Sequence, residues 1–299
     1  MATVYLPQYM NLQNINHFVG LVMGLDRQPL HGDVVFNFSG LHFIDGAGIT
    51  VLCNTIGWLR GRGISVAFCG HQNRNPGIRY LDDCGFFERY LQQTIQPIAS
   101  TRSTTIPAQP VALANMHSWV DTTAGPWLAE RLSVPGESLD EVRMCLREIF
   151  NNISEHAGED TGFVHIQHYP NRDRLGLTIS DFGSGIPSVI RSKYQADSDE
   201  SAIYTATEEG TSTKATEKRA GAGLNLLLRY TTIANQGNAS IYSGTGALLC
   251  APARDELVRT VRGAHGFFPG TLIDLEFRTD LISRDDETGG QGWPFESES

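Results

Sequence analysis

The sequence predicts an α/β protein made of two domains. The chain has 299 residues, which exceeds the length of about 150 residues expected for one domain. Strand-like and helix-like patterns alternate along it, and a Ser-, Thr- and Pro-rich segment at 99–110 separates two such blocks. We therefore place a first domain at 1–98, a linker at 99–110, a second domain at 111–280 and an acidic tail at 281–299. The tail is polar and glycine rich, and we expect it to be disordered.

The first domain contains a strand, a helix and a second strand. The stretch VVFNF at 34–38 has the alternation of a half-buried strand, and ISVAFC at 64–69 is the next strand. A helix is expected between them over 47–60, because Gly61 and Gly63 end it. This order with short glycine connections predicts a parallel pair of strands covered by a helix.

The second domain is predicted to contain a long amphipathic helix. Ser138 and Glu141 form a capping box that would open this helix, and Gly158 is its expected stop. A stripe of apolar residues at helical spacing marks its core-facing side: Leu139, Val142, Leu146, Ile149, Ile153 and Ala157. The other expected elements are a strand over 111–116, a helix near 124–132 starting at or after Pro126, a hairpin of strands over 162–170 and 174–182, a helix over 223–236, and strands over 239–252 and 270–277.

Composition excludes several classes of function. The formal net charge is -10, which argues against a nucleic-acid surface of clustered Lys and Arg. The five cysteines form no C-x-x-C pair and leave one over under any pairing, so neither a disulfide framework nor a zinc knuckle is expected. No run approaches the ~18 apolar residues of a membrane span, and the first residues lack the order of a signal peptide. We expect a cytoplasmic protein that binds neither nucleic acid nor membrane.

Two polar residues lie beside the apolar stripe of the long helix. Glu148 and Asn152 are four residues apart, so their side chains lie one above the other and can converge on one object. A carboxylate can accept a proton from a hydroxyl or a water, and an amide oxygen is a neutral ligand for Mg2+. The pair suits phosphoryl chemistry, although the same spacing alone is also typical of a solvated helix flank.

Two glycine motifs follow in the chain. ISDFGSGIP places Asp181 at the end of an apolar strand, directly before Gly183 and Gly185, so an acceptor carboxylate adjoins backbone that can be approached closely. RAGAGLNLLLRY places Gly221 and Gly223 before an apolar helix, where free N-H groups favour a phosphate. Each pair alone is also consistent with a simple turn or cap, and the order of the motifs is the stronger evidence.

In this order EIFNN, DFGSGI, GAGL and the GT of GTLIDLEF resemble the N, G1, G2 and G3 boxes of the GHKL ATPases. This group includes gyrase, MutL, sensor histidine kinases and anti-sigma-factor serine kinases, and the resemblance runs from about Gln109 to Arg278. It implies a Bergerat-fold α/β sandwich, in which a mixed sheet carries helices on one face. It also implies ATP and Mg2+ as ligands.

The resemblance assigns a role to each matching residue. Glu148 would orient or deprotonate the nucleophile, Asn152 would hold Mg2+ and Asp181 would accept from the adenine amino group. Thr271 would support the aspartate and its water. The remaining nucleotide-binding positions are Gly183, Gly185, Ile186, Gly221, Gly223 and Leu224.

The segment GTSTKATEKRAGAG between the boxes would form a lid over the phosphates. Lys214, Lys218 and Arg219 are its candidate phosphate contacts, and an ordinary charged loop is an equally good interpretation. The extra segment at 243–270 is longer than the shortest members of the family need, and nothing in the sequence gives it a function.

The first domain resembles a STAS domain, the α/β module of anti-sigma-factor antagonists, over about Asp33 to Leu91. Phosphorylated members carry a serine in the loop after the strand, but here residues 45–48 read DGAG. Thr50 lies further into the helix, where its oxygen would face the local backbone. We therefore expect a docking or dimerising element rather than the phosphorylated substrate of the adjoining domain.

Several further residues have a structural interpretation. His165 and His168 are three apart on a strand and point to opposite faces, which argues against a shared metal. His156 matches a position that is often His in the serine-kinase branch, and we expect it to pack or to support the site. Cys145 is interpreted as a small core residue.

Three functions remain open from the sequence. They are a Ser/Thr kinase of the anti-sigma type acting on a protein partner, an ATPase that switches association, and a nucleotide-sensing module without turnover. Glu148 counts against the third, and we give phosphorylation of a partner a slight lead over hydrolysis. A sensor histidine kinase is disfavoured, because the span before Gln109 reads α/β rather than a helical hairpin.

Overall fold

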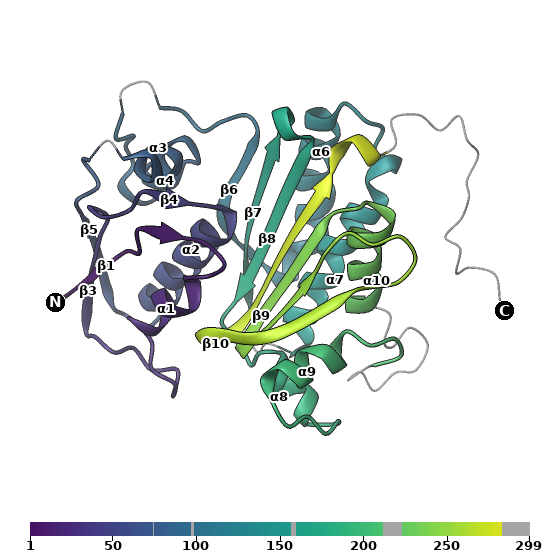
Figure 1. Ribbon diagram of the computed structural model, residues 1–299. Helices are drawn as coiled ribbons and strands as arrows, with labels where there is room; N and C mark the ends of the chain where they lie inside the picture. The colour runs from purple at the N-terminus through teal and green to yellow at the C-terminus, as the bar shows by residue number, and fades with distance from the viewer. Residues whose placement is uncertain (74, 97–98, 157–159, 212–222, 283–299) are drawn as a thin grey trace.

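The computed structural model describes residues 1–73, 75–96, 99–156, 160–211 and 223–282. The chain forms an N-terminal part and a C-terminal part that lie side by side (Figure 1). Each part contains a sheet with helices packed on it, which confirms the α/β class. None of the helices in the described ranges is long and apolar enough to cross a membrane.

The N-terminal part has a parallel sheet in the order β1 (Ala2–Tyr5), β3 (Asp33–Asn37) and β5 (Ser65–Cys69). Helix α2 (Gly46–Gly61) connects β3 to β5, so the predicted parallel pair with a connecting helix is confirmed. The other elements are β2 (Tyr9–Met10) and β4 (Phe43–Ile44), which pair in parallel, and the helices α1 (Ile15–Gly20), α3 (Pro76–Asp83) and α4 (Phe86–Leu91).

The C-terminal part is built on a five-stranded sheet. Its order is β6 (Thr105–Ala112), β7 (Thr161–Tyr169), β8 (Arg174–Asp181), β10 (Arg259–Arg278) and β9 (Asn238–Cys250). All four neighbouring pairs are antiparallel, so the expected mixed sheet is wrong in this respect. Two of these pairs, β7–β8 and β9–β10, are hairpins, which need no parallel crossover. The pairs β6–β7 and β8–β10 are formed by strands that lie further apart in the chain.

Strand β6 differs from its prediction in both position and length. It begins at Thr105, within the segment interpreted as a linker, and ends at Ala112, where the strand at 111–116 was expected to start. Ile106 and Ala108 are buried, while Pro107 and Pro110 are compatible with β6 because it is an edge strand with a register shift near them. The prolines of this segment therefore led to the prediction of a linker where an edge strand begins.

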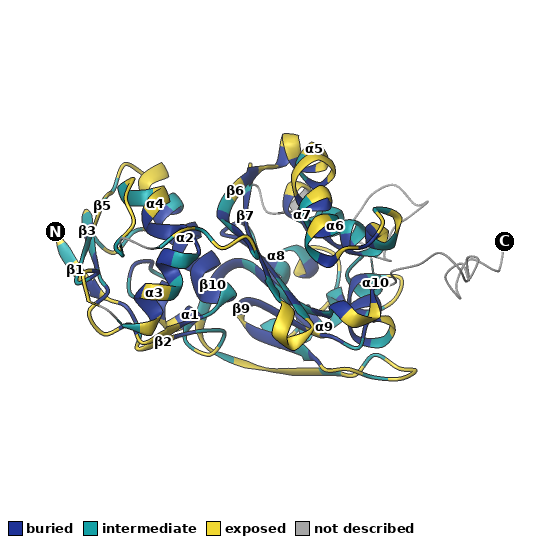
Figure 2. Cartoon of the chain, turned by 90° about the horizontal axis from the view of Figure 1, so that it is seen from above, coloured by how far each residue is buried: buried dark blue, intermediate teal, exposed yellow. Residues whose placement is uncertain are grey.

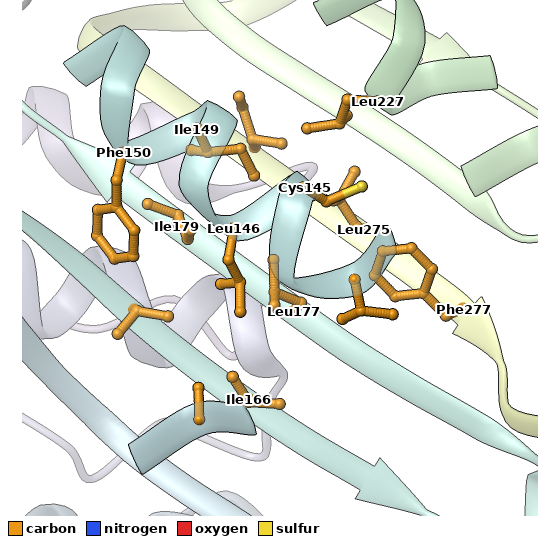
Figure 3. Packing of buried hydrophobic residues seen from close by; sticks show 14 of the residues in the cluster. Cys145, Leu146, Ile149, Phe150, Ile166, Leu177, Ile179, Leu227, Leu275 and Phe277 are labelled. Atoms are coloured by element: carbon orange, nitrogen blue, oxygen red, sulfur yellow. The ribbon is translucent and has the colours of Figure 1, made fainter. Parts of the chain in front are cut away.

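Helices of the C-terminal part cover one face of this sheet (Figure 1). They include α6 (Gly125–Leu132), α7 (Asp140–His156) and α10 (Gly223–Arg229). The other helices of this part are α5 (Met116–Trp119), α8 (Ile186–Arg191) and α9 (Asp199–Ala206). The described residues of the predicted stripe are buried, and Leu146 and Ile149 pack over Leu177 and Ile179 of β8 (Figure 3). Ala157 and the expected stop at Gly158 lie outside the described residues. This packing fixes α7 along the sheet.

The capping box predicted from Ser138 and Glu141 is wrong. Ser138 lies in a 3-10 turn, Glu137–Leu139, that leads directly into α7, and Asp140 already has helical backbone angles. A capping residue needs an extended backbone to aim its oxygen at the first free N-H groups. The Ser138 hydroxyl is instead buried without a hydrogen-bond partner.

The opposite face of the sheet is covered by the N-terminal part (Figures 1 and 2). Helix α2 packs on β7 and β8, and Trp58 contacts Phe182 with ring centroids 6.3 Å apart. A Cβ built on Gly57 would lie 2.6 Å from Cζ of Phe163, so the helix and the strand approach closely. One apolar cluster includes side chains from both parts, so the sheet is buried on both faces.

A polar row lies within this interface. His165, Thr178 and Asp274 are directly opposite one another on β7, β8 and β10, and the Thr178 hydroxyl donates to Asp274 Oδ1 at 2.5 Å. Gly46, at the start of α2, faces this row: a Cβ there would lie 3.2 Å from the His165 ring and 3.3 Å from the Thr178 hydroxyl oxygen. The loop of the N-terminal part that the STAS resemblance singled out is therefore docked on the sheet.

The segment at 243–270 lies mostly in a long antiparallel ribbon. Strands β9 and β10 continue their pairing to Cys250 and Arg259, with register shifts between Gly263 and Thr271. The amide of Asn16 on α1 donates to the Gly266 carbonyl oxygen at 3.0 Å. The ribbon thus provides a second contact between the two parts.

Candidate functional site

Helix α7 positions the first two candidate residues. The amide of Asn152 donates to Glu148 Oε1 at 3.1 Å, so the two side chains converge as their spacing predicted. Both are partly buried beside the fully packed Ile149 and Ile153. A carboxylate and an amide are therefore held together at the edge of the core.

Helix α10 begins against this pair. A Cβ built on Gly223 would overlap Glu148 Oε1 and lie 2.5 Å from Cδ of the same carboxylate. Only glycine allows the start of α10 to approach so closely, which joins the predicted G2 motif to Glu148. Leu224 packs against the core of the C-terminal part. Gly221, Lys214, Lys218 and Arg219, like the residues assigned to the acidic tail from 283 onward, lie outside the described residues.

Asp181 lies at the end of β8, and its side chain is buried. Because side chains alternate along a strand, Asp181 shares the α7-facing side of β8 with Leu177 and Ile179 (Figure 3). Its Oδ1 accepts from the Gly183 backbone N-H at 2.8 Å. Asp181 and the Glu148–Asn152 pair are therefore on the same side of the sheet.

Strand β10 closes one side of Asp181. Thr271 is directly opposite Asp181 in the ladder. A Cβ built on the preceding Gly270 would overlap the Asp181 carbonyl oxygen and lie 2.6 Å from Oδ1. Gly270 was not among the predicted site residues, although the GT pair in the sequence contains it.

The turn after Asp181 is tied to both β9 and β10. Gly185 has φ +76°, which favours glycine, and a Cβ there would lie 2.9 Å from the Ser243 hydroxyl oxygen. The Ile186 N-H donates to this oxygen at 2.9 Å, and the hydroxyl donates to the Gly270 carbonyl oxygen at 2.6 Å. Sequence reasoning missed Ser243, because only the tertiary fold brings it beside the turn.

Two histidines and a cysteine have the environments of structural residues. His165 is buried in the interface, and desolvation lowers the pKa of its ring to about 4. His168 lies three residues after His165 on β7, opposite Leu175 of β8, and burial lowers the pKa of the His168 ring as well. Burial raises the pKa of the fully buried Cys145 thiol, as do the Glu141 and Glu148 carboxylates, so the expected core role of Cys145 is confirmed. The side chain of His156 is outside the described residues.

A separate groove of about 1090 Å³ lies between α1, the loop that follows it and the β9–β10 ribbon. None of the predicted site residues lines this groove. Across the described parts of the chain, no group of three or more His, Cys, Asp and Glu residues could hold a metal ion.

The described residues of the boxes therefore lie on the α7 side of the sheet, as the resemblance to a Bergerat-fold domain predicts. Comparison with protein families agrees: residues 106–233 match the histidine kinase-like ATPase domain, and residues 3–102 match the STAS domain. The molecule therefore carries a STAS domain followed by an ATPase domain of the GHKL type, which confirms both resemblances. No curated protein matches the chain.

The STAS loop is a buried contact in this molecule. Asp45 caps α2 by accepting from the Gly48 N-H at 2.9 Å, and the Thr50 hydroxyl donates to the Gly46 carbonyl oxygen at 2.7 Å. The expected orientation of Thr50 toward the local backbone is confirmed, and this side chain is fully buried. The loop docks on the ATPase domain of its own chain.

Proposed function

We propose that the chain is an ATP-binding regulatory protein that uses Mg2+ to phosphorylate Ser or Thr on a protein partner. The observation that carries the proposal is the contact between Gly223 and Glu148, which places a glycine-initiated helix against a carboxylate already hydrogen-bonded to Asn152. This arrangement combines a proton acceptor, a cation ligand and close backbone approach in one place.

The described residues fit a magnesium nucleotide. The Asn152 amide nitrogen is engaged by Glu148, which leaves the amide oxygen as the atom for a cation. Because Gly223 and Gly270 have no Cβ, their backbone lies directly against Glu148 and Asp181 respectively, and a side chain at either position would displace the carboxylate. Bound Mg2+ would supply charge neutralisation on the phosphate oxygens.

Each candidate site residue then has a defined role in this proposal. Glu148, held by the Asn152 hydrogen bond, accepts the proton of the attacking hydroxyl or water. Asp181 accepts from the adenine amino group, with its carboxylate oriented by the Gly183 N-H. Lys214, Lys218, Arg219 and Gly221 are proposed to contact the phosphates, and Thr271 to support Asp181.

A partner supplies the acceptor hydroxyl in this proposal. The STAS loop of the chain has no hydroxyl at residues 45–48, and Thr50 is buried and hydrogen-bonded to the backbone. A partner of the STAS type, with a serine in that loop, is the acceptor we favour. The second candidate is a nucleotide-gated switch in which Glu148 activates water, and the close packing of the two domains favours it.

The test uses purified full-length protein with Mg2+ and radiolabelled ATP. Transfer of label to a co-expressed protein, lost in Glu148→Ala, supports the kinase. Phosphate release without any partner supports the switch instead. If ATP and ADP with Mg2+ leave the melting temperature unchanged, nucleotide binding itself is refuted.

A further inference from the structure

Three side chains of the STAS domain contact the end of β8 and the turn that follows it. The Asn54 amide donates to the Ser180 hydroxyl oxygen at 2.9 Å, and the next contact is the Trp58–Phe182 ring pair. The guanidinium of Arg27 then donates to the carbonyl oxygens of the following two residues, Gly183 at 2.9 Å and Ser184 at 2.8 Å. The STAS domain therefore contacts the residues on either side of Asp181 in the sequence.

Arg27 is presented by a tight turn of the STAS domain. Its backbone N-H donates to the Gly24 carbonyl oxygen at 2.9 Å, and the Gly24 N-H donates to the Gln28 carbonyl oxygen at 2.9 Å. Arg27 has φ 60°, and the neighbouring Leu25 is 81% exposed, so the turn projects from its domain. A guanidinium offers several donors in a rigid fork, which suits two successive carbonyls better than a lysine ammonium does.

The residue that Arg27 holds also orients Asp181. The carbonyl of Gly183 accepts from Arg27, while the N-H of the same residue donates to Asp181 Oδ1. A shift of Gly183 would therefore move the hydrogen bond that fixes the carboxylate. Bidentate contacts of this kind set geometry as well as energy.

We propose that Arg27 is a positioning residue for nucleotide binding, through which the STAS domain sets the affinity of the ATPase domain for adenine nucleotides. The inference rests on the proposed role of Asp181 in adenine recognition. Coupling between two sites is reciprocal, so bound nucleotide also stabilises the Arg27 turn. A partner that displaces this turn from Gly183 weakens nucleotide binding.

The first test is calorimetric titration of the full chain with ADP and Mg2+, and with GDP as a comparison. Arg27→Ala is expected to bind ADP about tenfold more weakly and to lose discrimination against GDP, because the adenine end is affected. Arg27→Lys should recover part of this loss. Arg79→Ala, which removes an exposed arginine of the same domain, should bind as the wild type does.

Discrimination between ADP and GDP separates positioning from a general loss of structure, because a partly unfolded sample binds less of both nucleotides. If Arg27→Ala binds ADP with unchanged affinity and still discriminates against GDP, the inference about Arg27 is overturned. The proposed function survives that result as long as Asp181→Asn weakens ADP binding. If wild-type protein binds no ADP, both fail together.

A second measurement needs no variant. Hydrogen exchange at residues 23–30 of the wild type is expected to slow when ADP and Mg2+ are added, by the same factor that Arg27 contributes to affinity. Equal exchange rates with and without ADP, at concentrations where calorimetry shows saturation, overturn the inference even if Arg27→Ala does not fold.

Discussion

Replacing Asp274 by asparagine tests the buried interface through its pH dependence. Burial raises the pKa of the Asp274 carboxyl from 3.8 to about 7, and Asp45 adds to this rise while the hydrogen bond from Thr178 opposes it. Burial likewise raises the pKa of Asp45 to about 6. Both groups lie where the start of α2 docks on the sheet.

The sign of the effect follows from these directions. A carboxyl whose pKa is higher in the folded state keeps a proton that the unfolded chain has already released. The ionisation of Asp274 therefore does not lower the free energy of unfolding below about pH 4, and it lowers this free energy progressively as the pH rises toward about 7. A pKa raised from 3.8 to about 7 corresponds to about 4 kcal/mol, and we expect about half of that because Asp274 is partly exposed.

Asp274→Asn removes the ionisation but keeps an oxygen that can accept from Thr178. We expect the variant to be as stable as the wild type near about pH 4 and more stable by about 2 kcal/mol near about pH 8. Urea unfolding followed by tryptophan fluorescence, measured at several pH values between these, would show the growing difference. The matched control is Asp255→Asn, which removes one exposed negative charge.

One result would refute this reasoning. If the stability advantage of Asp274→Asn over the wild type does not grow with pH, or only matches that of Asp255→Asn, the interface does not hold the carboxyl in its protonated form. The polar row beneath α2 would then be solvated, and the domains would be packed less tightly than the contacts of Gly46 indicate.

Three further predictions concern the site and the interface. Glu148→Ala should keep ADP binding and lose phosphoryl activity by about 10²–10⁴-fold, and turnover at the native rate in this variant would show that Glu148 is not the base. Asn152→Ala should weaken Mg2+-dependent nucleotide binding. Gly223→Ala should lose as much activity as Glu148→Ala while unfolding free energy changes by less than about 1 kcal/mol, because the carboxylate can swing into solvent; full activity would contradict this. Gly57→Ala should lower stability by about 1–2 kcal/mol through its clash with Phe163, and a higher melting temperature would contradict the tight contact.

The local elements were largely predictable because their signals are contained in short stretches of chain. The apolar stripe of α7 appears at helical spacing, and its described residues are buried as expected. The glycines around α2 and β5 marked the boundaries of these elements correctly. The order of the motifs also indicated the ATPase domain, because each box needs its own residues next to one another in the sequence. Gly270 escaped notice, since a close approach to Asp181 depends on which strand lies opposite.

Tertiary packing decided what short-range patterns cannot express. Thr178 and Ser180 alternate with apolar residues along β8, which is the pattern of a strand with one solvated face, yet both are buried beneath the STAS domain. A polar side chain looks the same in sequence whether water or another domain satisfies it, and here Asp274 and Asn54 provide the partners. The residues alone therefore determined the helices α2, α6, α7 and α10, most strands and the candidate nucleotide motifs. Only the fold determined that the STAS domain covers the sheet and that Arg27 reaches the turn after Asp181, because both contacts join residues more than a hundred positions apart.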